Sequence, residues 1–170
     1  MSLTLLLGGA RSGKSRLAVG RAAAAETVVF IAAGEAGDEE MAARIEAHRA
    51  ERDVRWTTVE EPVDVRVALQ SAPQDAFVIL DCLSLWVSNL IDRGWDDEAI
   101  EAEGARAAQV AAERPAPIVV VTNEVGLGIV PATPLGRRYR DVLGRVNAAF
   151  AGVADEALLV VAGRTLRLER

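Results

Sequence analysis

Cysteine and histidine occur only once each in this 170-residue chain, and basic residues are not in excess. The single cysteine, Cys82, cannot form an internal disulfide, and no cysteine and histidine set has the spacing of a structural zinc site. The chain has 25 acidic and 19 basic side chains, a net charge of −6, which argues against a nucleic-acid-binding protein. A phosphate ligand would therefore need a local cluster of cations and backbone amides.

Long hydrophobic runs are absent too. No apolar run reaches the roughly 18 residues that a membrane span needs. The N-terminus lacks the basic flank and cleavage signal of a secretory peptide, and we find no internal repeat, low-complexity tract or linker. We therefore expect a single domain over residues 1–170, without a membrane span and in the cytoplasm.

What the chain does have is a series of short apolar runs separated by helix-like stretches. This alternation predicts an α/β fold, with a mostly parallel sheet covered by helices on both faces. Strands are expected at 3–7, 28–32, 76–80, 118–122 and 157–162, with a short final one within 163–170. Helices are expected at 14–25, 38–52, 63–70, 84–92, 96–113 and 135–151.

The first loop of this pattern satisfies the phosphate-binding signature G-x-x-x-x-G-K-[ST] in full. It consists of Gly8, Gly9, Ala10, Arg11, Ser12, Gly13, Lys14 and Ser15. A buried strand enters the loop and a helix leaves it, so backbone N–H groups and the helix N-terminus can hold a nucleoside triphosphate. Lys14 is expected to reach the β- and γ-phosphates, and the Ser15 hydroxyl to ligate Mg²⁺. The fold class is then a RecA-like P-loop NTPase.

A second magnesium ligand is expected at the end of a neighbouring strand. Asp81 follows four apolar residues, which places its carboxylate at the carboxyl edge of the sheet. It is the best candidate to hold magnesium, directly or through water. The alternative is an acid that only caps the following segment.

The chain has one histidine, His48, within a stretch that reads as a helix. At 100° per residue the helix places five residues on one face, namely Met41, Arg44, Ile45, His48 and Arg52. Two flanking guanidinium groups would lower the pKa of the imidazole and keep it neutral and nucleophilic. A purely structural histidine on a half-buried helix face is the alternative.

Three further stretches carry a resemblance to a known family. The first is 38–49 (DEEMAARIEAHR), which is followed by 56–60 (WTTVE); the second is 122–131 (TNEVGLGIVP) and the third is 140–147 (RDVLGRVN). In this order, behind the phosphate loop, they closely resemble the bifunctional adenosylcobinamide kinase/adenosylcobinamide-phosphate guanylyltransferase family of cobalamin biosynthesis. The resemblance runs over essentially the whole chain, and 122–131 is its most specific part, because simple nucleotide kinases lack it.

The resemblance implies two reactions at one site. The enzyme would phosphorylate adenosylcobinamide with ATP or GTP, and then transfer GMP from GTP to that phosphate, giving adenosylcobinamide-GDP. In the family the guanylyl group passes through a covalent histidine, which falls on His48, and Lys14 would stabilise the charge on the phosphates. Relatives are homotrimers, and the resemblance implies the same here.

The family's GTP contacts carry over to positions that match. Beyond Gly8–Ser15 they are Ala32, Ala33, Gly34, Arg49, Ala50, Glu51, Arg52, Glu60 and Asp81. Two positions depart from the family pattern, since the family more often has a hydroxyl residue at Ala33 and often has glutamate at Asp81. The first departure puts one nucleotide contact in doubt, and the second the reach to magnesium.

The segment after the expected strand 118–122 lies where ligands bind in open α/β folds. Asn123 and Glu124 are expected either to order the site or to contact substrate, and a purely structural loop is equally compatible with the sequence. Four arginines further on, Arg137, Arg138, Arg140 and Arg145, form a basic patch. This patch would face a phosphate, a neighbouring subunit or solvent.

Two other functions are compatible with the phosphate loop. One is a small-molecule kinase without guanylyl transfer, in which His48 is structural. The other is a RecA-like ATPase or nucleotide switch, which the absence of a basic DNA-binding surface and of an appended domain disfavours. The phosphate donor of the kinase step, its general base and a de novo or salvage role are left open.

Overall fold

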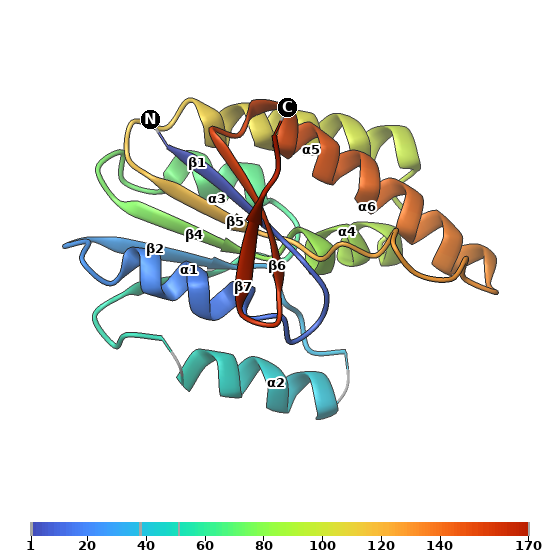
Figure 1. Ribbon diagram of the computed structural model, residues 1–170, viewed down its shortest axis with the longest axis horizontal. Coiled ribbons are helices and arrows are strands. Elements are labelled where there is room, and N and C mark those ends of the chain that lie inside the picture. Colours follow the sequence, from blue (N-terminus) through green and yellow to red (C-terminus); the bar gives the residue numbers. More distant parts are fainter. Residues whose placement is uncertain (1, 38, 51, 170) are drawn as a thin grey trace.

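The computed structural model describes residues 2–37, 39–50 and 52–169 and has a seven-stranded sheet at its centre (Figure 1). The strand order is β3-β2-β4-β5-β1-β6-β7. All pairs are parallel except β6 with β7, which are antiparallel. The strands are β1 (Leu3–Leu7), β2 (Val28–Ala32), β3 (Thr57–Glu60), β4 (Phe77–Asp81), β5 (Ile118–Val121), β6 (Glu156–Val161) and β7 (Arg164–Arg167).

Helices cover both faces of the sheet. They are α1 (Lys14–Ala22), α2 (Glu39–Ala50), α3 (Val65–Ser71), α4 (Leu83–Asp92), α5 (Asp97–Ala112) and α6 (Pro134–Val153). Figure 1 shows α3 to α6 above the sheet and α1 and α2 below it. The expected α/β class with a mostly parallel, doubly covered sheet is confirmed.

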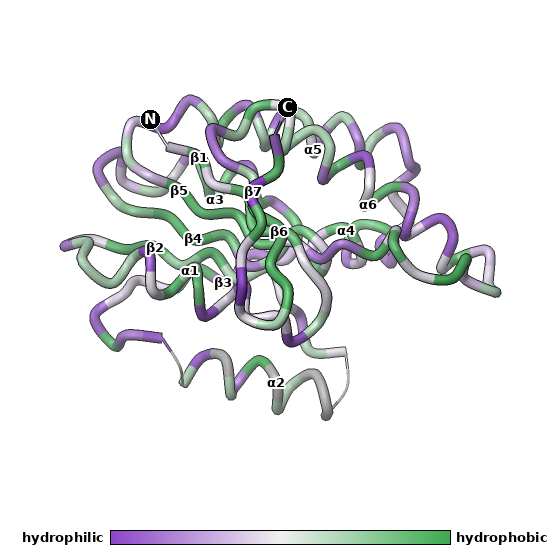
Figure 2. The backbone as a smooth tube through the Cα atoms, in the orientation of Figure 1, coloured by the Kyte–Doolittle hydropathy of each residue, from purple (hydrophilic) through white to green (hydrophobic). Residues whose placement is uncertain are grey.

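Alternate residues of the central strands pack into two separate cores. Leu5 and Leu80 face the core under α3 to α6, whereas Leu6 and Ile79 face the smaller core under α1. Because side chains alternate between the faces of a strand, a strand covered on both faces needs an unbroken apolar sequence. Figure 2 shows this as hydrophobic colouring along β5 and most of β4.

The structure differs from the sequence-based expectation in one strand and at several helix ends; α1, for example, ends at Ala22, three residues before the expected end. The strand β3 was not expected, because Thr57, Thr58 and Glu60 are exposed at the edge of the sheet and the segment lacks a buried apolar run. The helix α2 ends at Ala50, two residues before the expected end. The next residues form a turn in which the Asp53 carboxylate accepts the Arg55 N–H, and this turn leads the chain into β3.

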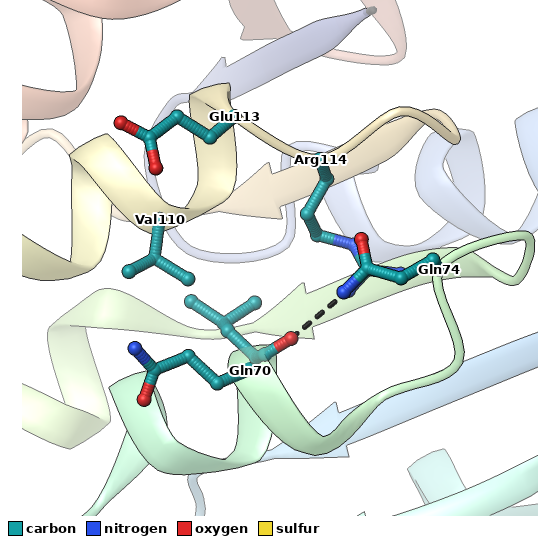
Figure 3. A pocket seen from close by; sticks show the side chains of 6 residues that line it. Gln70, Gln74, Val110, Glu113 and Arg114 are labelled. Carbon is teal, nitrogen blue, oxygen red and sulfur yellow. Dashed lines mark hydrogen bonds between the residues drawn. The ribbon is translucent and has the colours of Figure 1, made fainter.

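The amino edge of the sheet is tied together by Arg114. Its guanidinium is buried and donates to the carbonyl oxygens of Leu69, Ala72, Pro73 and Ala76, at the end of α3 and in the loop before β4. Figure 3 shows the pocket beside it, which is also lined by Gln70, Gln74, Val110 and Glu113. Because four carbonyl groups use this cation as a donor, we assign Arg114 a structural role.

The segment before α6 carries most of the exposed apolar surface near the opposite, carboxyl edge. Leu127 is 82% and Ile129 is 97% exposed, and Val130 and Leu135 are also largely exposed. Among the described residues, no helix combines the length and hydrophobicity that crossing a membrane requires.

Candidate active site

The phosphate loop connects β1 to α1 and depends on glycine at two positions. Gly13 has φ +101°, a left-handed conformation that a side chain would strain. A methyl group at Gly8 would collide with the carbonyl oxygen of Val160 in β6. The turn between β6 and β7 also holds the loop, since the Gly163 N–H donates to the Ser12 carbonyl at 2.8 Å. The loop geometry therefore rests on the C-terminal hairpin as well as on its own sequence.

Lys14 begins α1 and folds back into the loop. Its Nζ donates to the carbonyl oxygens of Gly8 at 2.9 Å and Gly9 at 2.7 Å. The side chain is only 7% exposed, and this burial lowers its pKa, while its electrostatic interactions with Cys82 and Asp81 act in the opposite direction. An ammonium group at the centre of the loop is suited to neutralise the oxygens of bound phosphates.

The sheet places the expected acidic residues along one edge. In the strand register Ala32 of β2 lies opposite both Glu60 of β3 and Asp81 of β4, and Asp81 lies opposite Val121 of β5. Val121 in turn lies opposite Leu6, two residues before the phosphate loop. The carboxyl ends of β3, β2, β4, β5 and β1 therefore form one continuous line, as expected for a ligand edge of an α/β fold.

Asp81 lies at the end of β4, next to Lys14. The two charges are close enough for Asp81 to act on the pKa of Lys14. The following peptide bond, to Cys82, is cis. Ser15 lies in the first turn of α1 and is half-buried.

The hydroxyl of Ser15 and the carboxylate of Asp81 are oxygen donors of the kind that Mg²⁺ prefers. Among the side chains that the structure describes, no three histidine, cysteine, aspartate or glutamate residues gather around one point. A magnesium ion at this edge would therefore draw its other ligands from phosphate and water, as is usual for this ion at nucleotide sites.

Arg52 packs against the end of β2. Its guanidinium carbon lies 4.0 Å from the centroid of the Phe30 ring, a cation–π contact. Its Nε and Nη1 atoms are buried without a hydrogen-bond partner in the protein. Burial lowers the pKa of Arg52, and the negative charge of Asp81 opposes this. A buried guanidinium with two unused donors beside Asp81 is suited to bind an anion.

Arg49, in the last turn of α2, forms ion pairs with Glu60 at the end of β3 and with Glu46. The hydrogen bond that Arg49 donates to Glu60 is the main cause that raises the pKa of Arg49. This pair fastens α2 to the edge of the sheet. Ala50 is the exposed last residue of α2.

The expected nucleophile His48 belongs to α2 by its backbone, but its side chain lies outside the described part of the structure, as do those of Met41 and Arg44. Glu51 lies outside it entirely. Of the expected helical face, only the side chains of Ile45 and Arg52 are therefore described. Ile45 is half-buried near Gly34, where a Cβ would lie 3.5 Å from Ile45 Cγ1, and Arg52 lies beyond the end of the helix.

Ala33 and Gly34 follow β2 toward α4. The Ala33 side chain is fully buried, and its carbonyl accepts a hydrogen bond from Asn89 Nδ2 at 2.8 Å. A Cβ on Gly34 would lie 3.3 Å from Leu85 Cδ1, so the lack of a side chain at Gly34 lets the segment after β2 pack closely against Leu85 of α4. The methyl group of Ala33 therefore packs inside the protein, at the position where a hydroxyl was the family's usual residue.

The residues that hold the end of β5 were not singled out from the sequence. Asn147 of α6 is 4% exposed, accepts from Thr122 Oγ1 at 2.7 Å and donates to the Asn123 carbonyl at 3.0 Å. The Glu124 N–H then donates to the Gly8 carbonyl at 3.2 Å. One signal was present, since Asn147 is the last residue of the 140–147 stretch.

The four-arginine patch expected on α6 is largely neutralised within the fold. Arg138 pairs with Asp97, Arg145 with Glu101 and Arg140 with Asp141. Arg137 donates to the carbonyl oxygens of Pro131 and Ala132. These bonds join α6 to α5 and to its own preceding loop, so the structural interpretation of the patch is favoured.

Several solved structures share the fold at low sequence identity. The RadB recombinase superposes with a TM-score of 0.52 at 16% identity, over 93% of this chain and 73% of that one. The type III secretion ATPase EscN of enteropathogenic E. coli superposes with a TM-score of 0.60 at 13% identity, over 95% of this chain and 43% of that one. These likenesses establish the RecA-like P-loop NTPase fold.

Sequence relatives are much closer. The bifunctional adenosylcobalamin biosynthesis protein CobU of Salmonella typhimurium is 40% identical over 98% of this chain and 99% of its own. The corresponding protein CobP of Pseudomonas aeruginosa is 41% identical over 97% of this chain and 96% of its own. The family model described as cobinamide kinase / cobinamide phosphate guanyltransferase matches residues 4–168. The chain belongs to the cobinamide kinase / cobinamide phosphate guanyltransferase family.

Proposed function

We propose that this protein phosphorylates adenosylcobinamide and then transfers GMP from GTP to the resulting phosphate, which gives adenosylcobinamide-GDP. One observation carries the proposal, namely about 40% identity to proteins named as bifunctional adenosylcobalamin biosynthesis proteins over almost their entire length. The sequence motifs support it, because the phosphate loop and the 122–131 segment occur in one chain.

In the first step the substrate hydroxyl attacks the γ-phosphorus of ATP or GTP. Lys14, already directed into the loop by two backbone carbonyls, exchanges these acceptors for phosphate oxygens. The loop N–H groups and the N-terminus of α1 stabilise the same charge. Positioning and charge stabilisation supply most of the catalysis in phosphoryl transfer.

In the second step the His48 imidazole attacks the α-phosphorus of GTP, and the bond from that phosphorus to pyrophosphate breaks. The substrate phosphate then attacks the phosphorus of the guanylyl group. The bond from that phosphorus to His48 breaks, and the histidine is free again. His48 is the single histidine of the chain, so one residue is available for this role. Arg52 supports the step as a buried cation with unused donors beside Asp81.

The nucleotide-binding residues are the phosphate loop Gly8–Ser15, the segment Ala32–Gly34, the segment Arg49–Arg52, and Glu60 and Asp81. Ser15 and Asp81 hold magnesium, which when bound would neutralise charge on the phosphates. We propose that the protein folds as one domain, forms a homotrimer and is located in the cytoplasm. The exposed apolar segment around Ile129 would be covered by substrate or by a second subunit.

The covalent intermediate gives the sharpest test. The wild-type protein is incubated with magnesium and GTP labelled at the α-phosphorus, denatured, and examined for protein-bound label. We expect an acid-labile, base-stable label that His48→Ala abolishes, whereas GTP labelled at the γ-phosphorus leaves none. Because the chain has a single histidine, a phosphoramidate with this stability can be assigned by one substitution.

A wild-type protein that turns over without any covalent label would contradict the guanylyl-histidine route. A protein that phosphorylates cobinamide and transfers no GMP at all would instead be a small-molecule kinase. That outcome would assign His48 a structural role.

A further inference from the structure

Glu124 lies beside the phosphate loop because of the strand order. The strand β5 is between β4 and β1, so the chain that leaves it passes between Asp81 and the loop. The Glu124 N–H donates to the carbonyl oxygen of Gly8, and Lys14 Nζ donates to the same oxygen. The backbone of Glu124 and the loop lysine thus share one acceptor, which places Glu124 beside the phosphate loop.

The position of Glu124 is fixed from two sides. On one side the amide of Asn147 holds the preceding residues Thr122 and Asn123. On the other side the Glu124 Oε1 atom accepts the Gly126 N–H at 2.5 Å. A carboxylate has two oxygens that accept hydrogen bonds, and this turn uses one of them. The second oxygen can serve a ligand without breaking the turn.

The other acids of this edge have different tasks. Asp81 faces the charge of Lys14 and is the proposed magnesium ligand. Glu60 is paired with Arg49. Glu124 differs from both because its partner is a backbone N–H of its own turn and no salt bridge involving it is found among the described residues. Its carboxylate can accept a proton without giving up an ion pair.

We propose that Glu124 is the general base of the kinase step, an inference that rests on the proposed function. Its carboxylate takes the proton of the substrate hydroxyl as the oxygen forms a bond to the γ-phosphorus. The bond from that phosphorus to the β–γ bridging oxygen breaks, and the nucleoside diphosphate leaves with the electron pair. The carboxyl group afterwards returns the proton to water.

The guanylyl step does not need this base. Its final nucleophile is a phosphate monoester. The second pKa of such a group is about 6, so the group is ionised at neutral pH. A general base acts only where a proton must be removed from the attacking group. Loss of Glu124 as a base should therefore slow the first reaction and spare the second.

The test measures the two steps separately in Glu124→Gln. Glutamine Oε1 can still accept the Gly126 N–H, so the turn is retained while the base is removed. Kinase turnover is measured with adenosylcobinamide and ATP, and guanylyl transfer with adenosylcobinamide phosphate and GTP. Glu113→Gln, at the opposite edge of the sheet, is the matched control, and Glu124→Asp is the conservative variant.

We expect kcat of the kinase step to fall about 10²- to 10⁴-fold in Glu124→Gln with little change in KM, as is typical for loss of a general base. Guanylyl transfer should stay near the wild-type rate, and Glu124→Asp should recover part of the kinase rate.

Near-normal kinase turnover in Glu124→Gln overturns the inference. An equal loss of both steps also overturns it, because it would show that Glu124 only orders the loop. A wild-type protein with no kinase activity toward adenosylcobinamide would instead refute the proposed function, and this inference with it.

Discussion

The hydroxyl of Thr122 donates a 2.7 Å hydrogen bond to Oδ1 of Asn147, a residue that lies 25 positions later in the chain. Both side chains are buried. The bond joins the end of β5 to the middle of α6, and Asn147 Nδ2 holds the next carbonyl, that of Asn123. The carboxyl edge of the sheet is thereby fixed at the point where the chain reaches the phosphate loop.

Replacing Asn147 by leucine should destabilise the protein, because the buried Thr122 hydroxyl and Asn123 carbonyl would lose their partner. We expect the free energy of unfolding to fall by about 2 kcal/mol, measured by urea denaturation. The double variant Thr122→Val/Asn147→Leu should lose less than the sum of the single variants, because the unpaired hydroxyl is gone. Strict additivity would refute a direct coupling between the two side chains.

Lys14→Ala should damage both reactions, because they share one loop. We expect kcat of each step to fall about 10²- to 10³-fold, the size of effect found when a charge-stabilising donor is removed. Arg106→Ala, on the exposed face of α5, is the control. Guanylyl transfer that survives Lys14→Ala unchanged would show that the two steps use different phosphate sites.

Lys14 is also the single lysine of the chain, so mass spectrometry can follow its acylation and the protection from acylation that we expect GTP to give.

Arg52→Met should separate nucleotide binding from stability. In the free protein Arg52 has two buried donors without partners, so replacing it with an apolar side chain should leave the free energy of unfolding unchanged or slightly higher. The Kd for GTP should rise about tenfold to a hundredfold, as expected for the loss of one charge-assisted hydrogen bond. Thermal unfolding with and without GTP measures both quantities, and Arg55→Met is the exposed control. Unchanged GTP affinity would contradict a role for Arg52 in the site.

Alkaline pH should destabilise the protein through Cys82. Burial, assisted by the negative charge of Asp81, raises the pKa of the thiol from 9.0 to about 11. In the unfolded chain the thiol ionises first, so its contribution is complete below about pH 9 and is lost between about pH 9 and 11. The loss should reach about 2 to 3 kcal/mol, measured as the difference in urea unfolding between wild type and Cys82→Val. Parallel pH profiles in the two proteins would contradict this assignment.

The buried strands were predictable because their information is local. An apolar run such as 3–7, which is short and is followed by glycines, indicates a strand buried on both faces, and the glycine spacing of 8–15 defines the loop that follows it. The strand β3 was missed for the opposite reason, since Thr57 and Thr58 are exposed and their strand is defined by pairing with β2. The position of β3 at the edge is determined by the strand order of the whole sheet.

In the candidate site too, residues whose position follows from the local sequence were predictable, and contacts between distant segments were not. The acid at the end of β4 followed from its position after four apolar residues. The contact between Arg52 and Phe30 could not be derived in this way, because it depends on where α2 ends and on the turn that follows. The hydrogen bonds of Asn147 join two segments whose proximity only the packing of α6 against the sheet determines.

The position of β1 has a consequence for the order in which the protein is made. This strand is the first to leave the ribosome, yet its neighbours in the sheet are β5 and β6, which are translated more than a hundred residues later. At about 5 to 20 residues per second, the phosphate loop waits several seconds for the carbonyl of Val160 and the N–H of Gly163 that shape it. The contacts that shape the phosphate loop are therefore complete only after β6 and the turn before β7 have been synthesised.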